Sequence, residues 1–238
     1  MPTQRFFLCS LLTALLLVTV AVASSTQSVV DISVPDGTKL KATYFSSGKP
    51  GPGVLLLHQC NRQRKVWDGL AQQLSAAGLN VLTIDMRGFG ESGGTPEAQL
   101  TPAEIGKQRA KWGDDIEVAF QYLVSQPGVR KDMIGVGGAS CGVDSSIQTA
   151  IRHPEVHSLV LLSGPTNQKG RQFLRNAGNG PEFFSAADDD EFAGTVVEME
   201  WLYNITGNPG KKYVHEATGG HGADMFKAHP ELVAAITD

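Results

Sequence analysis

The sequence is poor in charge and contains no long run of like charges. Charged residues make up 18% of the 238 residues, and the formal net charge is -4. A balance this close to neutral gives no electrostatic basis for binding nucleic acid or an anionic membrane. No repeat period is visible either. The apolar content of 41% is enough for the buried core of one globular domain.

Cysteine is also scarce, with Cys9, Cys60 and Cys141 as the three in the chain. No residue pattern in the sequence is assigned to a cofactor, and we expect neither a cofactor nor a metal site. The sequence gives no indication of an oligomeric state. The remaining partner class is a small-molecule substrate.

The first 23 residues have the pattern of a signal peptide. Arg5 precedes an apolar run over residues 6–23 that ends in Ala-Val-Ala, a triplet of the kind that signal peptidases cleave after. The run is also close to the length of a membrane-spanning helix, but the triplet and the polar residues 24–28 favour cleavage. We therefore expect an exported protein, periplasmic or secreted, with no stable membrane insertion after cleavage. Its two remaining cysteines are Cys60 and Cys141.

Residues 24–238 carry one uninterrupted α/β pattern. Two extended segments come first, and apolar strands then alternate with helices. The expected strands are residues 28–37, 38–47, 53–60, 80–90, 133–140, 158–164, 181–191 and 211–222, and the expected helices are residues 66–78, 112–128, 143–154 and 223–236. This alternation predicts a single domain with a mostly parallel, twisted sheet of about eight strands and helices on both faces.

A glycine-flanked serine follows one of these strands. In GASCG, Ser140 lies between Gly138 and Gly142, with a strand before it and a helix after it. The G-x-S-x-G turn is sharp and raises the serine hydroxyl above the sheet at a helix N-terminus. Backbone N–H groups at that helix end can stabilise a developing negative charge. The pattern predicts a nucleophilic serine.

A serine hydroxyl needs a base that is oriented by a carboxylate. His221 follows the last strand in a glycine-rich loop and fits the base, whereas we expect structural roles for His153, His157, His215 and His229. The acid is expected after the strand EFFSAA, where residues 188–191 are all acidic. Asp190 is the first choice and Asp189 the second. A solvated acidic loop or a calcium site is the better interpretation of Asp188 and Glu191.

Together these pieces resemble the α/β-hydrolase superfamily, and in particular its compact, lidless esterase and dienelactone-hydrolase-like members. The matching pieces are LLLHQCN, DMRGFGES, GASCG, SAADDDEF and GGHG, in family order. The resemblance implies a nucleophile at Ser140, a base at His221 and an acid at Asp190, with Asp189 as the alternative. It also implies structural roles for three residues, Asp85, Arg87 and Ser92.

The resemblance further implies an oxyanion hole. One N–H comes from the residue after the nucleophile, Cys141, and the other from the loop after the third strand, at Cys60 or, as second choice, Gln59. Relatives often have glycine where this chain has Gln59. If Cys60 and Cys141 flank one pocket in this way, a disulfide between them is sterically reasonable. Two reduced, buried cysteines are the alternative, and Cys141 as nucleophile is disfavoured because the glycine spacing fits Ser140.

The segment between the expected strands at 158–164 and 181–191 is too short for a helical cap, so we expect an open site. Such a site suits small carboxylic esters, cleaved through an acyl-enzyme, better than long acyl chains. Fold does not choose among the alternatives on the same triad, which are amidase or peptidase, lactone hydrolase and acyltransferase activity. A non-catalytic binding module on the same scaffold is a further alternative.

Overall fold

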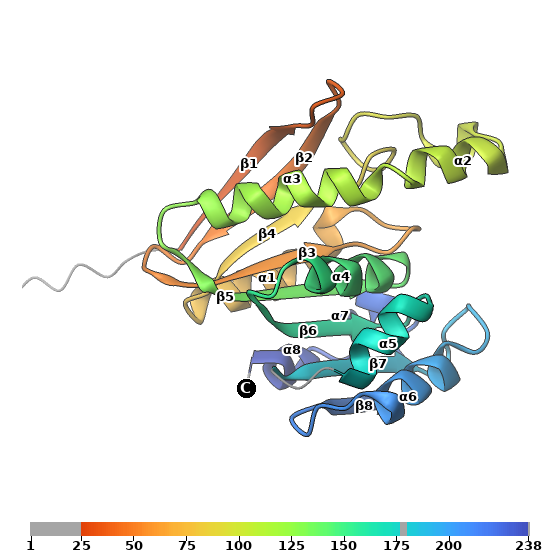
Figure 1. Ribbon diagram of the computed structural model, residues 1–238. Helices are drawn as coiled ribbons and strands as arrows, with labels where there is room; N and C mark the ends of the chain where they lie inside the picture. The colour runs from red at the N-terminus through yellow and green to blue at the C-terminus, as the bar shows by residue number, and fades with distance from the viewer. Residues whose placement is uncertain (1–24, 177–179, 238) are drawn as a thin grey trace, which may run out of the picture.

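The structure is a computed structural model that describes residues 25–176 and 180–237. The predicted signal peptide, residues 1–23, lies outside the described residues. Eight strands of the described chain form one sheet, with the order β1-β2-β4-β3-β5-β6-β7-β8 (Figure 1). β2 is antiparallel to both of its neighbours, and every other pair of neighbouring strands is parallel. The predicted α/β fold with a mostly parallel sheet is confirmed.

The strands and helices have the following bounds. The strands are β1 (Thr26–Ser33), β2 (Lys39–Ser46), β3 (Gly51–Leu57), β4 (Asn80–Ile84), β5 (Val129–Ala139), β6 (Val156–Leu162), β7 (Glu182–Ala187) and β8 (Lys212–Glu216). The α-helices are α1 (Asp68–Ala76), α2 (Pro102–Arg109), α3 (Trp112–Ser125), α4 (Cys141–Arg152), α5 (Gln168–Asn176), α6 (Thr195–Ile205), α7 (Met225–Ala228) and α8 (Glu231–Thr237).

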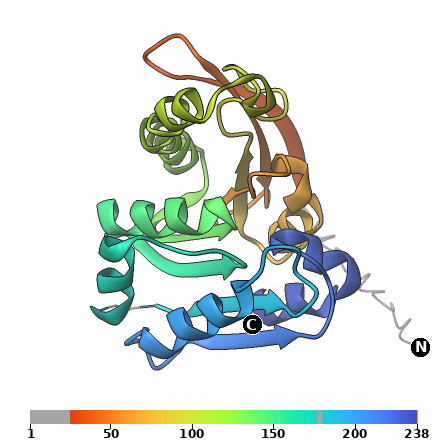
Figure 2. The same cartoon turned by 90° about the vertical axis from the view of Figure 1, so that its right-hand side faces the viewer.

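Helices cover both faces of the sheet, and each face has its own apolar cluster. Successive side chains of a strand point to opposite faces, so Leu55 and Leu57 of β3 join the cluster under α3, α4 and α6 while Leu56 joins the one under α1 and α8. Figure 2 shows α3 and α4 on one side of the sheet and α1 and α8 on the other. The continuous apolar strands of the sequence are therefore explained by burial on both faces.

Three helices lie where the sequence pattern predicted none, namely α2, α5 and α6. The predicted closing helix over residues 223–236 is divided into α7 and α8. Pro230 stands between them, and proline cannot donate the backbone hydrogen bond of a helix interior and disfavours helical geometry in the preceding residue. Between β6 and β7 the described chain holds only α5, so the expected absence of a cap domain agrees with this fold. Among the described helices, none has the length and hydropathy needed to cross a bilayer.

The residues expected to be structural in DMRGFGES form buried polar contacts. Arg64 pairs with Asp85, and Arg87 pairs with Asp115 through two hydrogen bonds of 2.7 and 2.5 Å. The Ser92 hydroxyl donates to the carbonyl of Asp85. These pairs tie the loop after β4 to its neighbours.

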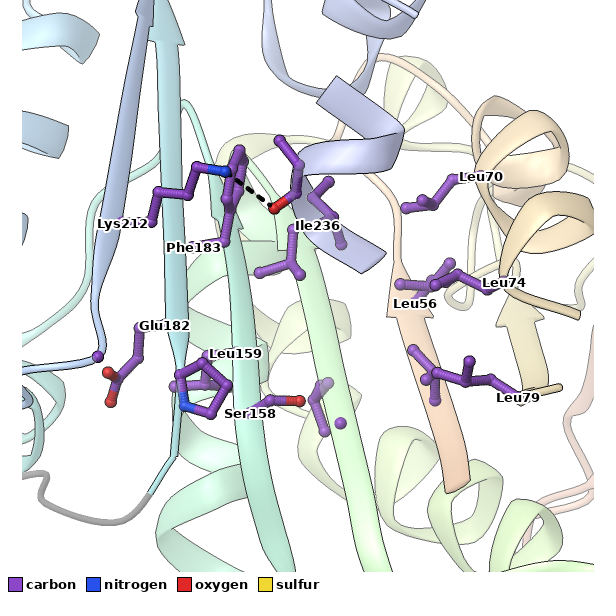
Figure 3. Close-up of a pocket in the computed structure, with 17 residues that line it drawn as sticks. Leu56, Leu70, Leu74, Leu79, Ser158, Leu159, Glu182, Phe183, Lys212 and Ile236 are labelled. Atoms are coloured by element: carbon purple, nitrogen blue, oxygen red, sulfur yellow. Dashed lines mark hydrogen bonds between the residues drawn. The ribbon is translucent and has the colours of Figure 1, made fainter. Parts of the chain in front are cut away.

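An apolar cavity of about 210 Å³ lies under α1 and α8, and neither Ser140 nor His221 lines it. Figure 3 shows leucine side chains on its walls and Glu182, the first residue of β7, at one end. The Glu182 side chain is 5% exposed, and its Oε2 has no hydrogen-bond partner among the described residues. Burial raises the pKa of Glu182 to about 7, although the charge of Lys211 opposes the shift.

The raised pKa of Glu182 makes the stability of the fold depend on pH. Below the ordinary pKa of 4.5 both the folded and unfolded states hold the proton, and no penalty arises. Between pH 4.5 and about 7 the unfolded chain ionises at Glu182 while the folded state keeps the proton, so the free energy of unfolding falls across this range, by about 3 kcal/mol in full above pH 7. We predict that Glu182→Gln raises the free energy of unfolding at pH 8 by up to about this amount and changes it little at pH 4.5, measured by urea denaturation.

Glu200→Gln is the matched control, because it removes the same charge from an exposed position of α6. It should leave the difference between the two pH values unchanged. An equal effect of Glu182→Gln at both pH values would contradict the assignment.

Candidate active site

Ser140 stands on a strained turn between β5 and α4. Its φ is 52° and its ψ is -118°, a conformation that non-glycine residues rarely adopt. A Cβ atom on Gly138 would clash with the carbonyl of Gly142, and one on Gly142 with the carbonyl of Leu57. The two flanking glycines are therefore required by close backbone approach. The structure thus contains the sharp strand-to-helix turn that the sequence pattern predicted.

His221 lies in the loop after β8 and is 3% exposed. Its Nδ1 lies 2.9 Å from Oδ1 and 2.8 Å from Oδ2 of Asp190, whose side chain is 2% exposed. The other ring nitrogen, Nε2, is buried and has no hydrogen-bond partner among the described residues. A neutral ring that carries its proton on Nδ1, toward the carboxylate, would present a free lone pair at Nε2, as a general base requires.

The three adjacent aspartates after β7 have three different partners. Asp188 pairs with Nε2 of the half-exposed His215 at 2.7 Å. Asp189 accepts from the backbone N–H groups of Gly219 and Gly220 at 3.2 and 2.8 Å. Asp190 alone of the three contacts the imidazole of His221. Asp189 therefore holds the backbone of the histidine loop, whereas Asp190 orients the ring.

Ser140, Asp190 and His221 follow the carboxyl ends of β5, β7 and β8, which are parallel strands of one sheet. The corresponding loops therefore meet at one edge of the sheet, where α/β proteins bind ligands. The histidine loop also packs against the strand that carries Ser140, since a Cβ on Gly222 would lie 3.1 Å from the Cβ of Ala139. The three predicted residues therefore follow strands that end at the same edge of the sheet, and of the three the side chains of Asp190 and His221 are in hydrogen-bond contact.

A disulfide joins Cys60, in the loop after β3, to Cys141, the first residue of α4. The two Cα atoms are 5.9 Å apart, within the range that a disulfide bridges. Cys141 begins its helix, so its N–H has no acceptor inside the helix. No group of the described chain accepts from the N–H of Cys60. Two unpaired backbone donors thus flank the bridge, one on each side.

Three further histidines have side-chain partners outside the candidate triad. His153 pairs with Glu117 at 2.8 Å and stacks on Phe120. His229 contacts Glu216 and Glu231, which raise its pKa. His58, in the loop after β3, is fully buried and accepts from the N–H of Met86.

One residue beside the site had no signal in the sequence analysis. Phe192 is 50% exposed, and its ring centroid lies 4.4 Å from that of His221. Its backbone N–H donates to Oδ1 of Asp190 at 2.9 Å. Large exposed aromatic side chains beside polar groups are typical of ligand contacts. A single phenylalanine two positions after the acid carries no recognisable motif, so the sequence could not single it out.

A family model described as serine aminopeptidase, S33, a hydrolase family, matches residues 48–187. The chain belongs to this family. It is therefore an α/β hydrolase, as the resemblance of its motifs implied.

Relatives of this hydrolase include a thiohydrolase, aneE, from Aspergillus aculeatus, which is 28% identical over 140 residues that make up 58% of this chain and 41% of the relative. The hydrolase spans about half or less of the length of the curated relatives it matches. Among solved structures, an esterase from Pyrococcus furiosus has a TM-score of 0.69 at 20% identity, over 90% of this chain and 89% of that chain. A predicted hydrolase from Thermoplasma acidophilum has a TM-score of 0.71 at 17% identity, over 90% and 98%. Both structures share the fold.

The disulfide of this hydrolase closes a long loop, since 81 positions separate its cysteines. Closing a loop of this length lowers the conformational entropy of the unfolded chain, and this raises the free energy of unfolding by about 4 kcal/mol. We predict that the double variant Cys60→Ser, Cys141→Ser lowers the free energy of unfolding by about that amount, measured by urea denaturation.

Peptide mass mapping of protein made in an oxidising compartment checks the bridge directly. Alkylation should label Cys60 and Cys141 only after reduction. Full labelling of both thiols in the native, unreduced protein would show that the bridge is absent.

Proposed function

We propose that the protein is an exported serine hydrolase that cleaves small carboxylic esters, with Ser140 as nucleophile, His221 as base and Asp190 as acid. The observation that carries the proposal is the environment of the buried His221 ring. Its Nδ1 contacts the carboxylate of Asp190, and its Nε2 has no hydrogen-bond partner among the described residues. A serine on a strained turn and a histidine ring oriented by a buried carboxylate at the same edge of the sheet are the groups that acyl transfer requires.

In the proposed reaction, the Ser140 hydroxyl attacks the ester carbonyl and its proton passes to Nε2 of His221. Asp190 stabilises the resulting imidazolium. The N–H groups of Cys141 and Cys60 stabilise the oxyanion, with that of Gln59 as the alternative second donor. His221 then protonates the departing alcohol, and water activated by the same ring releases the acid from the acyl-enzyme.

Two features support small substrates with an apolar group. Among the described residues, α5 is the only helix between β6 and β7, and so short a segment suits a site for compact esters. The exposed ring of Phe192 beside His221 offers an apolar surface next to the reacting centre. We therefore place short-chain aryl esters, such as acetates and butyrates, first among the substrates. Export is supported by the signal-peptide pattern of residues 1–23 together with the Cys60–Cys141 disulfide.

Thioesters are the second candidate substrates, because a matching relative is a thiohydrolase. The same acyl-enzyme forms from an ester or a thioester, and only the leaving group differs. A panel of nitrophenyl esters of increasing acyl length, acyl thioesters, aminoacyl amides and lactones separates these classes. The proposal expects the highest kcat/KM on the short esters, and a preference for long acyl chains contradicts it.

Ser140→Ala should abolish turnover of these esters, by at least about 10³-fold in kcat, because no nucleophile remains. The variant should stay folded, since it removes a single hydroxyl. Labelling with a fluorophosphonate probe, which reacts only with an activated serine, should occur in the wild type and disappear in the variant. Equal labelling of both proteins would refute the assignment.

The three adjacent aspartates provide a matched series for the acid. Asp190→Asn should lower kcat by about 10³- to 10⁴-fold, because the amide cannot stabilise the imidazolium and favours the wrong tautomer. Asp189→Asn should cost about 10-fold or less, because the amide oxygen still accepts from one of the two backbone N–H groups and the contact between Asp190 and the His221 ring is kept. Asp188→Asn should leave kcat unchanged. A larger loss in Asp189→Asn than in Asp190→Asn would reverse the assignment.

A further inference from the structure

We propose that Gln59 is a positioning residue for the reaction, which holds the loop of His221 in register with the loop that carries the proposed oxyanion donor. This inference rests on the proposed function. The side chain of Gln59 makes contacts of its own, and these carry the inference.

Gln59 is fully buried, and its side-chain amide forms all of its hydrogen bonds with the loop of residues 221–224. Nε2 donates to the backbone carbonyl of His221 at 2.9 Å and to Oδ2 of Asp224 at 3.2 Å. Oε1 accepts from the backbone N–H of Ala223 at 2.8 Å. A glutamine amide has two N–H donors and one carbonyl acceptor, so both of its ends bind residues 221–224.

The histidine loop is shaped to receive this amide. Gly222 has a φ of 59°, and a Cβ atom there would lie 2.6 Å from Oε1 of Gln59. Glycine is therefore required at position 222 both by the left-handed backbone and by the close approach of the amide. The close packing of the amide against the histidine loop therefore depends on both Gln59 and Gly222.

The other side of Gln59 is fixed as well. Its carbonyl accepts from the N–H of Arg62 at 3.0 Å and lies 2.8 Å from Nδ1 of His58. The next residue, Cys60, is bonded to Cys141, which directly follows Ser140. Arg62 also pairs with Asp224 at 2.7 Å. Gln59 thus joins the loop of the base to a turn that is itself covalently attached to the turn of the nucleophile.

The consequence for catalysis follows from the two restraints on His221. Asp190 fixes the orientation of the ring, whereas Gln59 fixes the backbone from which the ring projects. Loss of the amide leaves the ring free to shift relative to Ser140 while keeping its carboxylate partner. A misplacement of about 1 Å at a reacting group can cost about 100-fold in rate, and it acts on the chemical step more than on substrate binding.

The test is Gln59→Met, which keeps the approximate volume of the side chain and removes its three hydrogen bonds. We expect kcat for p-nitrophenyl butyrate to fall about 10- to 100-fold, with KM within about 3-fold of the wild type. The loss should be larger for ethyl butyrate, because its poorer leaving group needs a proton from His221 while nitrophenolate departs without one. Rates are divided by the concentration of folded protein. Circular dichroism gives that concentration, at a temperature well below the unfolding transition.

Gln63→Met is the matched control. Gln63 is exposed in the same loop, and its side chain makes no hydrogen bond to the described chain. It should retain wild-type kcat for both esters. If Gln59→Met does not fold, Gln59→Glu serves in its place, since it keeps an acceptor for the N–H of Ala223 and turns the donor into an oxygen that faces His221 and Asp224.

Each outcome decides a separate question. An active wild type with a Gln59 variant whose kcat lies within about 2-fold of it overturns this inference alone. A loss that is equal for both esters, or one that disappears when rates are expressed per folded molecule, also overturns it, because a purely structural role predicts these results. A wild type that neither hydrolyses esters nor reacts with a fluorophosphonate overturns the proposed function and this inference with it.

Discussion

Ser140 combines a positive φ with a backbone N–H that donates to the carbonyl of Leu162 in β6 at 2.8 Å. Its own carbonyl accepts from Val143 in the first turn of α4. The chain must therefore leave one strand, bond to the next and enter a helix within a few residues. Only a turn this tight places a hydroxyl at the carboxyl edge of the sheet and at a helix N-terminus together. Every other part of the candidate site is arranged around this point.

The histidine loop meets that requirement because it is held from two sides. Asp189 and Asp190, after β7, bind its backbone and its ring respectively. Gln59, after β3, binds its backbone from the opposite direction. In the sheet order, β3 and β7 lie on either side of β5, which ends at Ser140. The histidine loop is therefore anchored from both sides of β5, although β6 also lies between β5 and β7, and neither anchor alone defines its position.

The sequence predicted the parts of this structure that are encoded locally. Runs such as VLLL and LVLL are apolar at every position because both faces of the sheet are covered, and GASCG specifies a turn through the residues within it. The sequence ranks Asp190 before Asp189 as the candidate acid, but it does not give the different partners of the two carboxylates. Neighbouring aspartates differ only in what they contact in the folded chain. Helix α6 was missed because its apolar residues do not form one face, and exposed Val197 and Trp201 interrupt the periodicity. The partners of Gln59 were beyond prediction since they lie more than 160 positions away.

The loop after β3 shows why that distant contact matters for the chemistry proposed here. Glycine, which the family resemblance implies for this place, tolerates more backbone conformations than any other residue. This chain has Gln59 instead, and the path is set by links to the surrounding loops: Cys60 to Cys141, Gln59 to the histidine loop, and Asn61 to Glu191 beside the acid. The links run to all three loops of the candidate triad, so the proposed oxyanion donor can move only if the nucleophile, base or acid loop moves with it. Side-chain contacts thus determine the conformation of the loop after β3. Through them, the geometry of the proposed oxyanion hole is coupled to that of the candidate triad.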